Sequence, residues 1–256
     1  MQVDAQQSAI AHLFGVSADN RAQDVARLAL RHLQDAVVNL VYRRHPPGRS
    51  RLLNLGCGDC LYPGWINADR FRTGYWLTQL GGLVSRRLRL PDWVLDAAEP
   101  WRCADDHWDG IYTEHMLEHL SYREAVAVMR EMLRTLRPGA WARIILPDLG
   151  RFIDFYNGDR GDSDFLNRFA FGAEAISFLT QNFGHISAWD GALLEAVLRE
   201  IGFVNVRIVA YGEGADRRLL KDSPDRRWES VYVEAQKPPR GSDLGATEPA
   251  LAACVG

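Results

Sequence analysis

Residues 52–69 combine two residue types that can bind a nucleotide-like ligand. A short apolar run leads into a Gly-Cys-Gly turn at residues 56–58, and a second apolar piece ends at Asp69. Glycines let the backbone approach a ligand closely, and a carboxylate after the next strand can accept hydrogen bonds from hydroxyl groups. The pattern predicts a nucleotide-type site at the carboxyl edge of a parallel sheet. Asp96, which ends a third short apolar stretch, is a second acid in the same kind of position.

A second group of residues can move a proton or orient a reacting group. Glu114 and His115 follow a stretch that predicts a strand, and His185 ends a long polar and aromatic excursion. A carboxylate or an imidazole at the carboxyl edge of the sheet can hold an acceptor group or take its proton. We therefore treat Glu114, His115 and His185 as candidates for a catalytic role.

Other residues near the same edge are candidates for contact with a substrate. His119 can either reach a substrate or pack as an ordinary buried histidine, and Asp148 follows another predicted strand. The aromatic side chains of the excursion could line an acceptor pocket, although for each one alone the core of a small lid is the favoured interpretation. These aromatic residues are Tyr156, Phe165, Phe169 and Phe171. The residues that we assign to substrate contact are His119, Asp148, Tyr156 and Trp189.

Two short motifs could bind a metal ion, and we expect that neither does. Residues 115–119 read H-x-x-E-H, which could place two imidazoles one helical turn apart for zinc. The motif is short enough to arise by chance, and it directly follows a predicted sheet strand. Cys57 and Cys60 form a C-x-x-C pair, but the chain has no second pair, and Cys57 already fills the middle of the glycine turn.

Composition excludes several classes of protein. The chain has 256 residues, of which 47% are hydrophobic, so one large α/β domain with a sizeable core is possible. A net charge of −3 gives no reason to expect nucleic acid as a partner. No apolar run is long enough for a transmembrane helix, and the N-terminal residues do not read as a secretory signal. Four cysteines are too few for a disulfide scaffold, so we expect a cytoplasmic protein of undetermined oligomeric state.

Alternating strand and helix patterns predict an open, doubly wound α/β sheet of three layers, α/β/α, mostly parallel with an antiparallel last strand. The connection between the first two strands is too short for an ordinary crossover, so a helix there must be very short or absent. Residues 70–92 predict an inserted helix-turn element. The expected strands are 52–55, 65–68, 94–96, 108–113, 141–146, 203–210 and 230–235, and the expected helices are 22–44, 122–136 and 191–200. The expected domains are a helical segment at 1–48, a main domain at 49–236 with an insertion at 151–184, and a disordered tail at 237–256.

Seven short pieces within residues 51–149 occur in an order that is typical of one enzyme family. They are residues 54–58 (NLGCG), 64–69 (GWINAD), 95–97 (LDA), 108–112 (WDGIY), 114–120 (EHMLEHL), 136–139 (LRPG) and 143–148 (RIILPD). With these pieces the chain resembles the class I S-adenosylmethionine-dependent methyltransferases, in particular the bacterial group with the type-11 methyltransferase domain. The resemblance implies a Rossmann-like sheet of seven strands with the cofactor across the carboxyl ends of the strands.

The resemblance also implies roles for individual residues. Asp69 would bind the ribose hydroxyls, and Asp96 would accept a hydrogen bond from the adenine amino group with help from the Ala97 backbone. The residues that the resemblance places at the cofactor are Asn54, Gly56, Cys57, Gly58, Asp69, Asp96, Ala97 and Thr113. The implied activity is methyl transfer from S-adenosylmethionine, with an oxygen of a small-molecule, sugar or glycan acceptor slightly favoured. The alternative is a methyltransferase-like protein that binds the cofactor or a partner without turnover.

Overall fold

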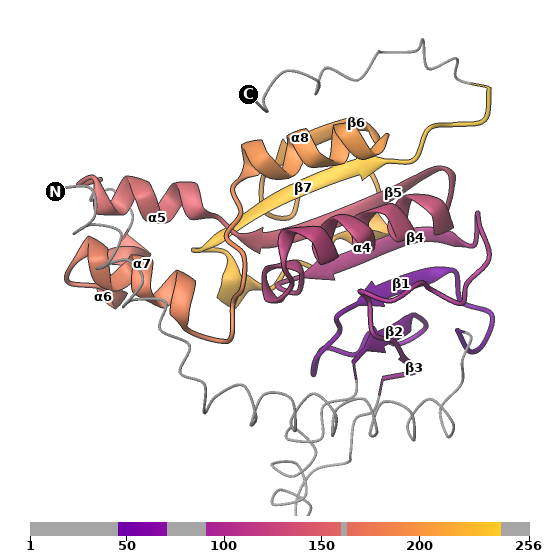
Figure 1. Cartoon of the computed structure of the whole chain (residues 1–256), viewed down its shortest axis with the longest axis horizontal. Helices are drawn as coiled ribbons and strands as arrows, with labels where there is room; N and C mark the ends of the chain where they lie inside the picture. Colours follow the sequence, from indigo (N-terminus) through magenta and orange to yellow (C-terminus); the bar gives the residue numbers. More distant parts are fainter. Residues whose placement is uncertain (1–45, 71–90, 160–162, 242–256) are drawn as a thin grey trace, which may run out of the picture. The chain divides into compact units, whose positions relative to one another are not determined.

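The computed structural model describes residues 46–70, 91–159 and 163–241, which all belong to one compact unit of the chain. Within these residues a single mixed sheet has the strand order β3-β2-β1-β4-β5-β7-β6 (Figure 1). The five strands β3, β2, β1, β4 and β5, in this spatial order, pair in parallel. Strand β7 lies between β5 and β6 and is antiparallel to both. The predicted seven-stranded, mostly parallel sheet with an antiparallel last strand is confirmed. The strands are β1 (Leu52–Leu55), β2 (Ile66–Asp69), β3 (Trp93–Val94), β4 (Trp108–Glu114), β5 (Leu136–Pro147), β6 (Val204–Val209) and β7 (Ser230–Gln236).

The two longest described helices begin and end where their local sequence dictates. Helix α4 (Tyr122–Thr135) begins at a capping box, in which the Ser121 side chain and the Glu124 carboxylate each bond the other's backbone N–H. Helix α8 (Gly191–Ile201) begins at the Asp190 side chain and ends at Gly202, whose φ of 110° is costly for other residues. The remaining helices are η1 (Leu117–His119), α5 (Leu149–Tyr156), α6 (Ser163–Arg168), α7 (Gly172–Gln181), η2 (Arg217–Leu219) and η3 (Pro224–Arg226).

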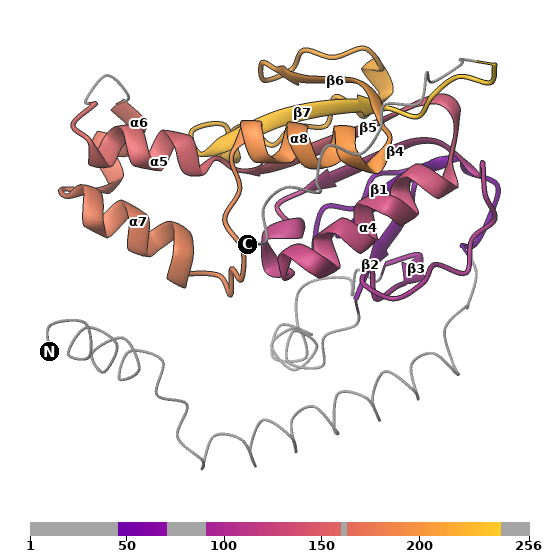
Figure 2. The ribbon, with the colours of Figure 1, turned by 45° about the horizontal axis from the view of Figure 1, so that its top comes forward.

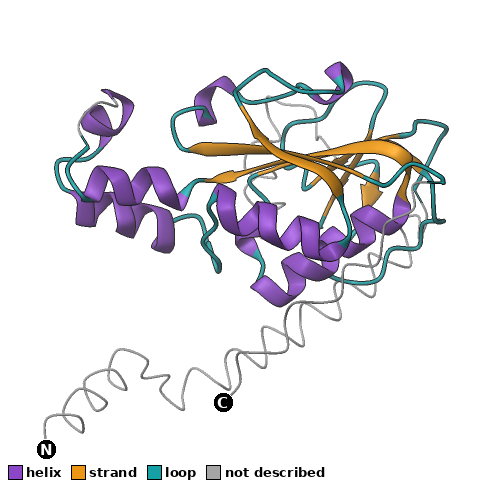
Figure 3. Ribbon diagram, turned by 90° about the horizontal axis from the view of Figure 1, so that it is seen from above, coloured by secondary structure: helices purple, strands orange, loops and turns teal. Residues whose placement is uncertain are grey.

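Both faces of the sheet are covered within the described residues. Helices α4 and α8 lie together on one face (Figure 3), where residues such as Met129 and Leu194 join the main apolar core. The other face carries a cluster of aromatic side chains, including Tyr112 and Tyr232, against which Leu219 of η2 packs. Side chains thus pack against both faces of the sheet. The carboxyl ends of the parallel strands β1 to β5 lie together at one edge of the sheet.

The excursion after β5 is a separate helical element with its own core. Helices α5, α6 and α7 lie beyond the ends of β5 and β7 (Figure 2). Phe165 and Phe169 are buried in a cluster with Trp228, so these two residues form part of a small core, and the role of this element as a lid stays a prediction. Tyr156 and Phe171 differ from this expectation, because they are 58% and 73% exposed.

The connection between β1 and β2 contains no helix, as its length predicted. Polar side chains hold it instead: Asn54 Nδ2 donates to the Cys60 carbonyl at 2.7 Å and to Asn67 Oδ1 at 3.0 Å. Asn67 Oδ1 also accepts from the Tyr62 N–H at 2.8 Å, and the Asn67 N–H donates to Asp92 Oδ2 at 2.9 Å. These hydrogen bonds pair polar groups of a loop that has no helical backbone hydrogen bonds.

Some expected boundaries shift, and others cannot be compared. Strand β5 begins at Leu136 rather than at residue 141, with a register irregularity against β4, and β3 ends at Val94, so Asp96 follows the strand. The expected helix at 22–44 and almost all of the expected element at 70–92 lie outside the described residues. The domain limits therefore stay predictions. Among the residues that the structure describes, the helices are too short or too polar to span a lipid bilayer.

Candidate functional site

The carboxyl ends of β1, β2 and β3 bring the glycine turn and the two predicted acids to one edge. The N–H groups of Gly56 and Cys57 both donate to the Ala68 carbonyl, at 2.8 and 3.0 Å, so the turn is tied to β2. The Gly58 N–H donates to Asp69 Oδ2 at 2.6 Å. The turn and Asp69 therefore form one unit, as the spacing of residues 52–69 predicted.

The two glycines of the turn have different surroundings. Gly56 and Gly58 both have positive φ, +72° and +49°. A Cβ on Gly56 would lie 2.4 Å from Met116 Cγ, whereas a Cβ on Gly58 would meet no atom of the described residues within 4 Å. Gly56 is thus required by packing inside the protein, whereas no described residue packs against the position of a Gly58 side chain.

Asp69 and Asp96 are held in place by neighbouring donors. Asp69 Oδ1 accepts from the Arg70 N–H at 2.6 Å, and Asp96 Oδ1 accepts from the Ala98 N–H at 3.2 Å. The Arg70 guanidinium pairs with Asp96 Oδ2 at 3.1 Å. A carboxylate oxygen can accept more than one hydrogen bond, so the chemistry of both acids suits the hydroxyl or amino groups of a ligand.

The other residues predicted at the cofactor are less accessible. Asn54 is 2% exposed, and its amide is used in the β1–β2 connection described above. Burial raises the pKa of the Cys57 thiol above its usual value. The Ala97 carbonyl accepts from Trp101 Nε1 at 2.9 Å, and Thr113 is 1% exposed on β4. Their contacts with a cofactor stay predictions.

Glu114, at the end of β4, is engaged on both oxygens. Its carboxylate accepts from the Tyr112 hydroxyl at 2.9 Å and from the Ser223 N–H at 3.0 Å. Burial raises its pKa above the usual value for a glutamate. These two bonds fix the loop that contains Ser223 against the end of β4, whatever further role Glu114 has.

His115 adopts a conformation that is unusual for a residue other than glycine. Its φ is +51°, and its N–H donates to the Ile145 carbonyl at 2.9 Å. Nε2 lies 2.8 Å from Ser230 Oγ, and Nδ1 lies 3.4 Å from Glu118 Oε1. Burial, followed by the charge of Arg226, lowers the pKa of His115 to about 3, so the ring is neutral.

The structure brings His185 to the same place from a distant part of the chain. His185 Nε2 lies 3.9 Å from Glu118 Oε1, and its ring is edge-on to the His119 ring with centroids 5.1 Å apart. Burial lowers the pKa of His185 as well. Two candidates for catalysis, His115 and His185, and one for substrate contact, His119, therefore surround one carboxylate.

That carboxylate, Glu118, was missed among the predicted site residues. It is 1% exposed, and neither of its oxygens makes a hydrogen bond within the described part of the chain. Burial raises its pKa to about 8. The signal was present in the sequence, because Glu118 is the acid of the H-x-x-E-H pattern that we set aside.

The remaining candidates for substrate contact are not brought together. Asp148 begins α5, where its Oδ1 accepts from the Gly150 N–H at 3.1 Å. Trp189 is 1% exposed in the main core, and its Nε1 donates to Ser187 Oγ at 2.9 Å. Tyr156 is exposed at the far end of α5. Their contacts with a substrate stay predictions.

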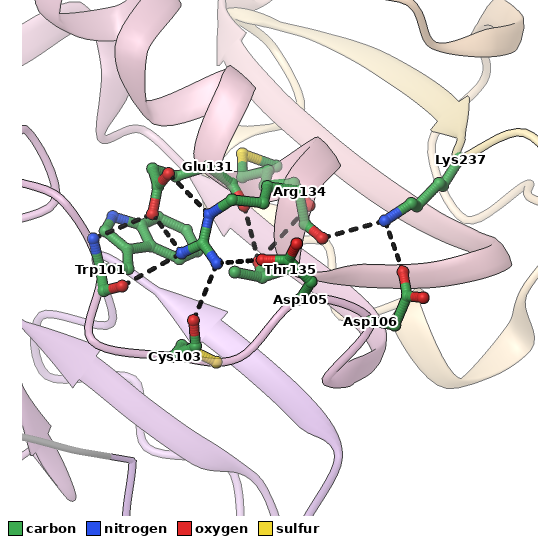
Figure 4. Close-up of polar contacts among 9 residues, drawn as sticks. Trp101, Cys103, Asp105, Asp106, Glu131, Arg134, Thr135 and Lys237 are labelled. Atoms are coloured by element: carbon green, nitrogen blue, oxygen red, sulfur yellow. Dashed lines mark hydrogen bonds and ion pairs between the residues drawn. The ribbon is translucent and has the colours of Figure 1, made fainter.

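The opposite, amino edge of the sheet has a different character. Arg134 joins the end of α4 to the loop before β4 through Glu131, Asp105 and the carbonyls of Trp101 and Cys103 (Figure 4). A surface hollow at this edge contains none of the predicted site residues. Its lining residues are Asp106, Arg137, Pro138 and Arg240.

Comparison with known proteins gives similarity of fold only. No protein-family model matches the chain, and no curated protein matches it. Solved structures that it resembles include the S-adenosylmethionine-dependent methyltransferase SibL in its apo form, at 17% identity over 74% of this chain and 50% of that chain, with a TM-score of 0.44. An S-adenosylmethionine-dependent methyltransferase from Archaeoglobus fulgidus is 17% identical over 81% of this chain and 94% of that chain, with a TM-score of 0.44.

A third similar structure is phosphoethanolamine N-methyltransferase 2 of Haemonchus contortus in complex with S-adenosyl-L-methionine. It is 14% identical over 76% of this chain and 50% of that chain, with a TM-score of 0.40. The chain thus spans half the length of this protein and of SibL. At such low identities and TM-scores, the case for a function has to come from the residues of the site.

Proposed function

We propose that the protein is an S-adenosylmethionine-dependent methyltransferase that transfers a methyl group to an oxygen of a small-molecule, sugar or glycan acceptor. The observation that carries the proposal is the grouping of Gly58, Asp69 and Asp96 at the carboxyl ends of three adjacent strands. The sheet order, with β7 antiparallel between β5 and β6, is the topology that the sequence resemblance implied.

The residues at this edge fit the chemical groups of the cofactor. No atom of the described residues lies within 4 Å of where a Gly58 Cβ would be, and a glycine there allows close approach of a ligand to the backbone. The Asp69 carboxylate accepts hydrogen bonds from the N–H groups of Gly58 and Arg70, and a carboxylate held in this way is the kind of acceptor to which ribose hydroxyls would donate. Asp96 would accept from the adenine amino group, and Ala97 would offer its backbone beside it.

The cofactor supplies an activated methyl group, so the protein has to align the acceptor and exclude water. His115, at the end of β4, is held rigidly by its backbone bond to Ile145 and its contact with Ser230. A neutral imidazole there can accept a hydrogen bond from an acceptor hydroxyl. Glu114 fixes the adjacent loop through Ser223, which makes it a positioning residue in this scheme. The helical element α5–α7 would cover the acceptor.

Calorimetry with S-adenosylhomocysteine tests the cofactor site directly. We expect the wild-type chain to bind this product and Asp69→Ala to lose detectable binding, because the carboxylate that holds the ribose is gone. Asp59→Ala, in the same turn, is the matched control and should bind normally. Circular dichroism of each variant checks that the fold is intact. A folded wild-type protein that fails to bind at high micromolar ligand would overturn the proposal.

Binding without turnover is the alternative that a second experiment separates. A wild-type chain that binds S-adenosylhomocysteine is incubated with labelled S-adenosylmethionine and a panel of hydroxylated small molecules, sugars and glycans. Transfer of the label to an acceptor, lost in Asp69→Ala, supports the enzyme. Binding with no transfer to any acceptor in the panel favours a cofactor-binding protein.

A further inference from the structure

Glu118 lies at the centre of a group of hydrogen-bond acceptors. Its carboxylate is buried beside His115 Nδ1, at 3.4 Å, and His185 Nε2, at 3.9 Å. Neither Glu118 oxygen has a hydrogen-bond donor within the described residues. A buried carboxylate without a donor is costly, since it has lost its water and gained nothing in return. Such a site needs either a proton or a cation.

The hydrogen bonds of the two imidazoles show which of their nitrogens carry protons. His185 Nδ1 lies 2.6 Å from the Leu179 carbonyl, which can only accept, so Nδ1 carries the proton and Nε2 presents a lone pair. The Ser230 hydroxyl donates to the Arg226 carbonyl at 2.7 Å, so its oxygen accepts from His115 Nε2. His115 Nδ1 therefore also presents a lone pair. Two imidazole lone pairs thus face one carboxylate.

His119 completes a set with the chemistry of a metal site. One ligand atom from each of Glu118, His119 and His185 lies within 4.8 Å of the other two. Tetrahedral bonds of about 2.1 Å bring ligand atoms to roughly 3.4 Å from one another, so small side-chain rotations close the set. Two imidazoles and one carboxylate are a ligand set that divalent transition metals prefer.

The backbone around the cluster is rigid without any ion. The N–H groups of Ile186 and Ser187 both donate to the Glu118 carbonyl, at 2.8 and 3.1 Å. The Ser187 hydroxyl donates to the Leu120 carbonyl at 2.8 Å. These bonds join η1 to the segment that contains His185, so the ligands are preorganised. The nearby Arg226 guanidinium pairs with Glu229 at 3.1 Å, which offsets part of its positive charge.

We propose that Glu118, His119 and His185 form a binding site for one divalent transition-metal ion of the zinc type. Three protein ligands leave a coordination position for water or for an oxygen of a bound molecule. The Leu179 carbonyl orients His185 in the way that backbone acceptors commonly orient ligating histidines.

This site differs from the zinc site that the sequence motif suggested. That motif needs His115 and His119 one turn apart on a helix. In the structure η1 begins at Leu117, and His115 precedes it with a φ of +51°, so the two rings are not placed in that way. His185 takes the place of His115 as a ligand, and it comes from the end of the helical excursion. The proposal does not rest on methyl transfer.

Metal titration of tag-free protein, stripped with a chelator and dialysed, tests the site. Calorimetry with Zn²⁺ should give one ion per chain at this site. His185→Ala and Glu118→Gln should each weaken binding by more than about 100-fold, because each removes a direct ligand. His107→Ala is the matched control, since His107 lies near the amino edge against Trp108 and should leave binding unchanged.

A second measurement keeps the test decisive if a variant folds poorly. Co²⁺ added to the stripped wild-type protein should give the absorption bands of a four- or five-coordinate ion, and Zn²⁺ should displace it. His119→Ala, whose ring is less buried, should weaken these bands. Absence of Co²⁺ and Zn²⁺ binding by folded wild-type protein, or equal losses in His107→Ala and His185→Ala, would overturn the proposal. The Glu118 carboxyl would then hold a proton instead.

Discussion

At the scale of single residues, the turn after β1 contains two glycines that both have positive φ but differ in how tightly the protein packs around them. Gly56 is enclosed by Met116, so its missing side chain is a matter of packing. A side chain on Gly58 would meet no atom of the described residues, so packing does not require glycine there, although its positive φ favours glycine and its N–H donates to Asp69. Stability and ligand binding should therefore respond differently to substitutions at the two positions.

Alanine at each glycine separates these effects. Gly58→Ala should cost about 1–2 kcal/mol of unfolding free energy, the usual cost of left-handed backbone, and should weaken S-adenosylhomocysteine binding. Gly56→Ala should cost more, about 3 kcal/mol, because the overpacking against Met116 adds to the same backbone cost. Urea unfolding measures stability, and calorimetry measures binding. Equal losses of stability in the two variants would contradict the assignment.

The acids at this edge could be predicted from sequence, and the central acid of the histidine cluster could not be assigned. Asp69 and Asp96 each follow a short apolar run, so their place at the ends of strands follows from local pattern. The environment of Glu118 depends on His185, which no local pattern connects to it. The H-x-x-E-H pattern marks His115, Glu118 and His119, but long-range packing brings His185 to them, and a local motif cannot report that contact.

At the scale of elements, a buried ionic network attaches the loop after β6 to the sheet. Arg143 on β5 has a fully buried side chain, whose Nε donates to Asp222 at 2.6 Å and whose Nη1 donates to the Glu213 carbonyl at 2.9 Å. It also contacts Glu234 on the antiparallel strand β7 at 3.4 Å. Arg207 on β6 contacts Glu234 from a half-exposed position at 3.0 Å. The network links three strands and one loop.

Removal of one member of this network should be costly. Arg143→Met should lower the unfolding free energy by about 3–5 kcal/mol, because Asp222 is left as a buried charge without its partner. Arg207→Met is the matched control and should cost less than about 1 kcal/mol, since its side chain is partly solvated. Urea denaturation of both variants provides the comparison. Similar midpoints for the two variants would show that the network contributes little.

Element boundaries were predictable where the chain carries its own start and stop signals. Helices α4 and α8 begin at residues 122 and 191, as expected from sequence, and each follows a residue whose side chain can cap a helix, Ser121 or Asp190. Strand β5 was not predictable at its start, because Leu136 pairs with Trp108 and the next pair is Trp141 with Gly110, so the register between them is irregular. The pairing partner, rather than the local sequence, extends that strand.

At the scale of the described sheet as a whole, its amino edge is joined across distant parts of the chain. Lys237, just after β7, donates to Asp106 Oδ1 at 2.7 Å and to the Arg134 carbonyl at the end of α4 at 2.9 Å (Figure 4). Arg240 reaches Asp106 Oδ2 at 3.2 Å. A cation near the last carbonyls of a helix is favourable as well. The described end of the chain is thus attached to the loop before β4.

These contacts predict a dependence of stability on pH. The hydrogen bond from Lys237, more than that from Arg240, lowers the pKa of Asp106 below its usual value. A lowered folded-state pKa stabilises the fold fully above the unfolded-state pKa of about 3.9, and this contribution is lost as pH falls through the folded-state pKa. Asp106→Asn should therefore lower the unfolding midpoint in urea at pH 7, and the deficit should shrink as pH falls below about 3.9. Glu200→Gln, which removes a carboxylate at an exposed position near the end of α8, is the matched control. A deficit of Asp106→Asn that stayed constant down to acid pH would mean that the charge of Asp106 does not stabilise the fold.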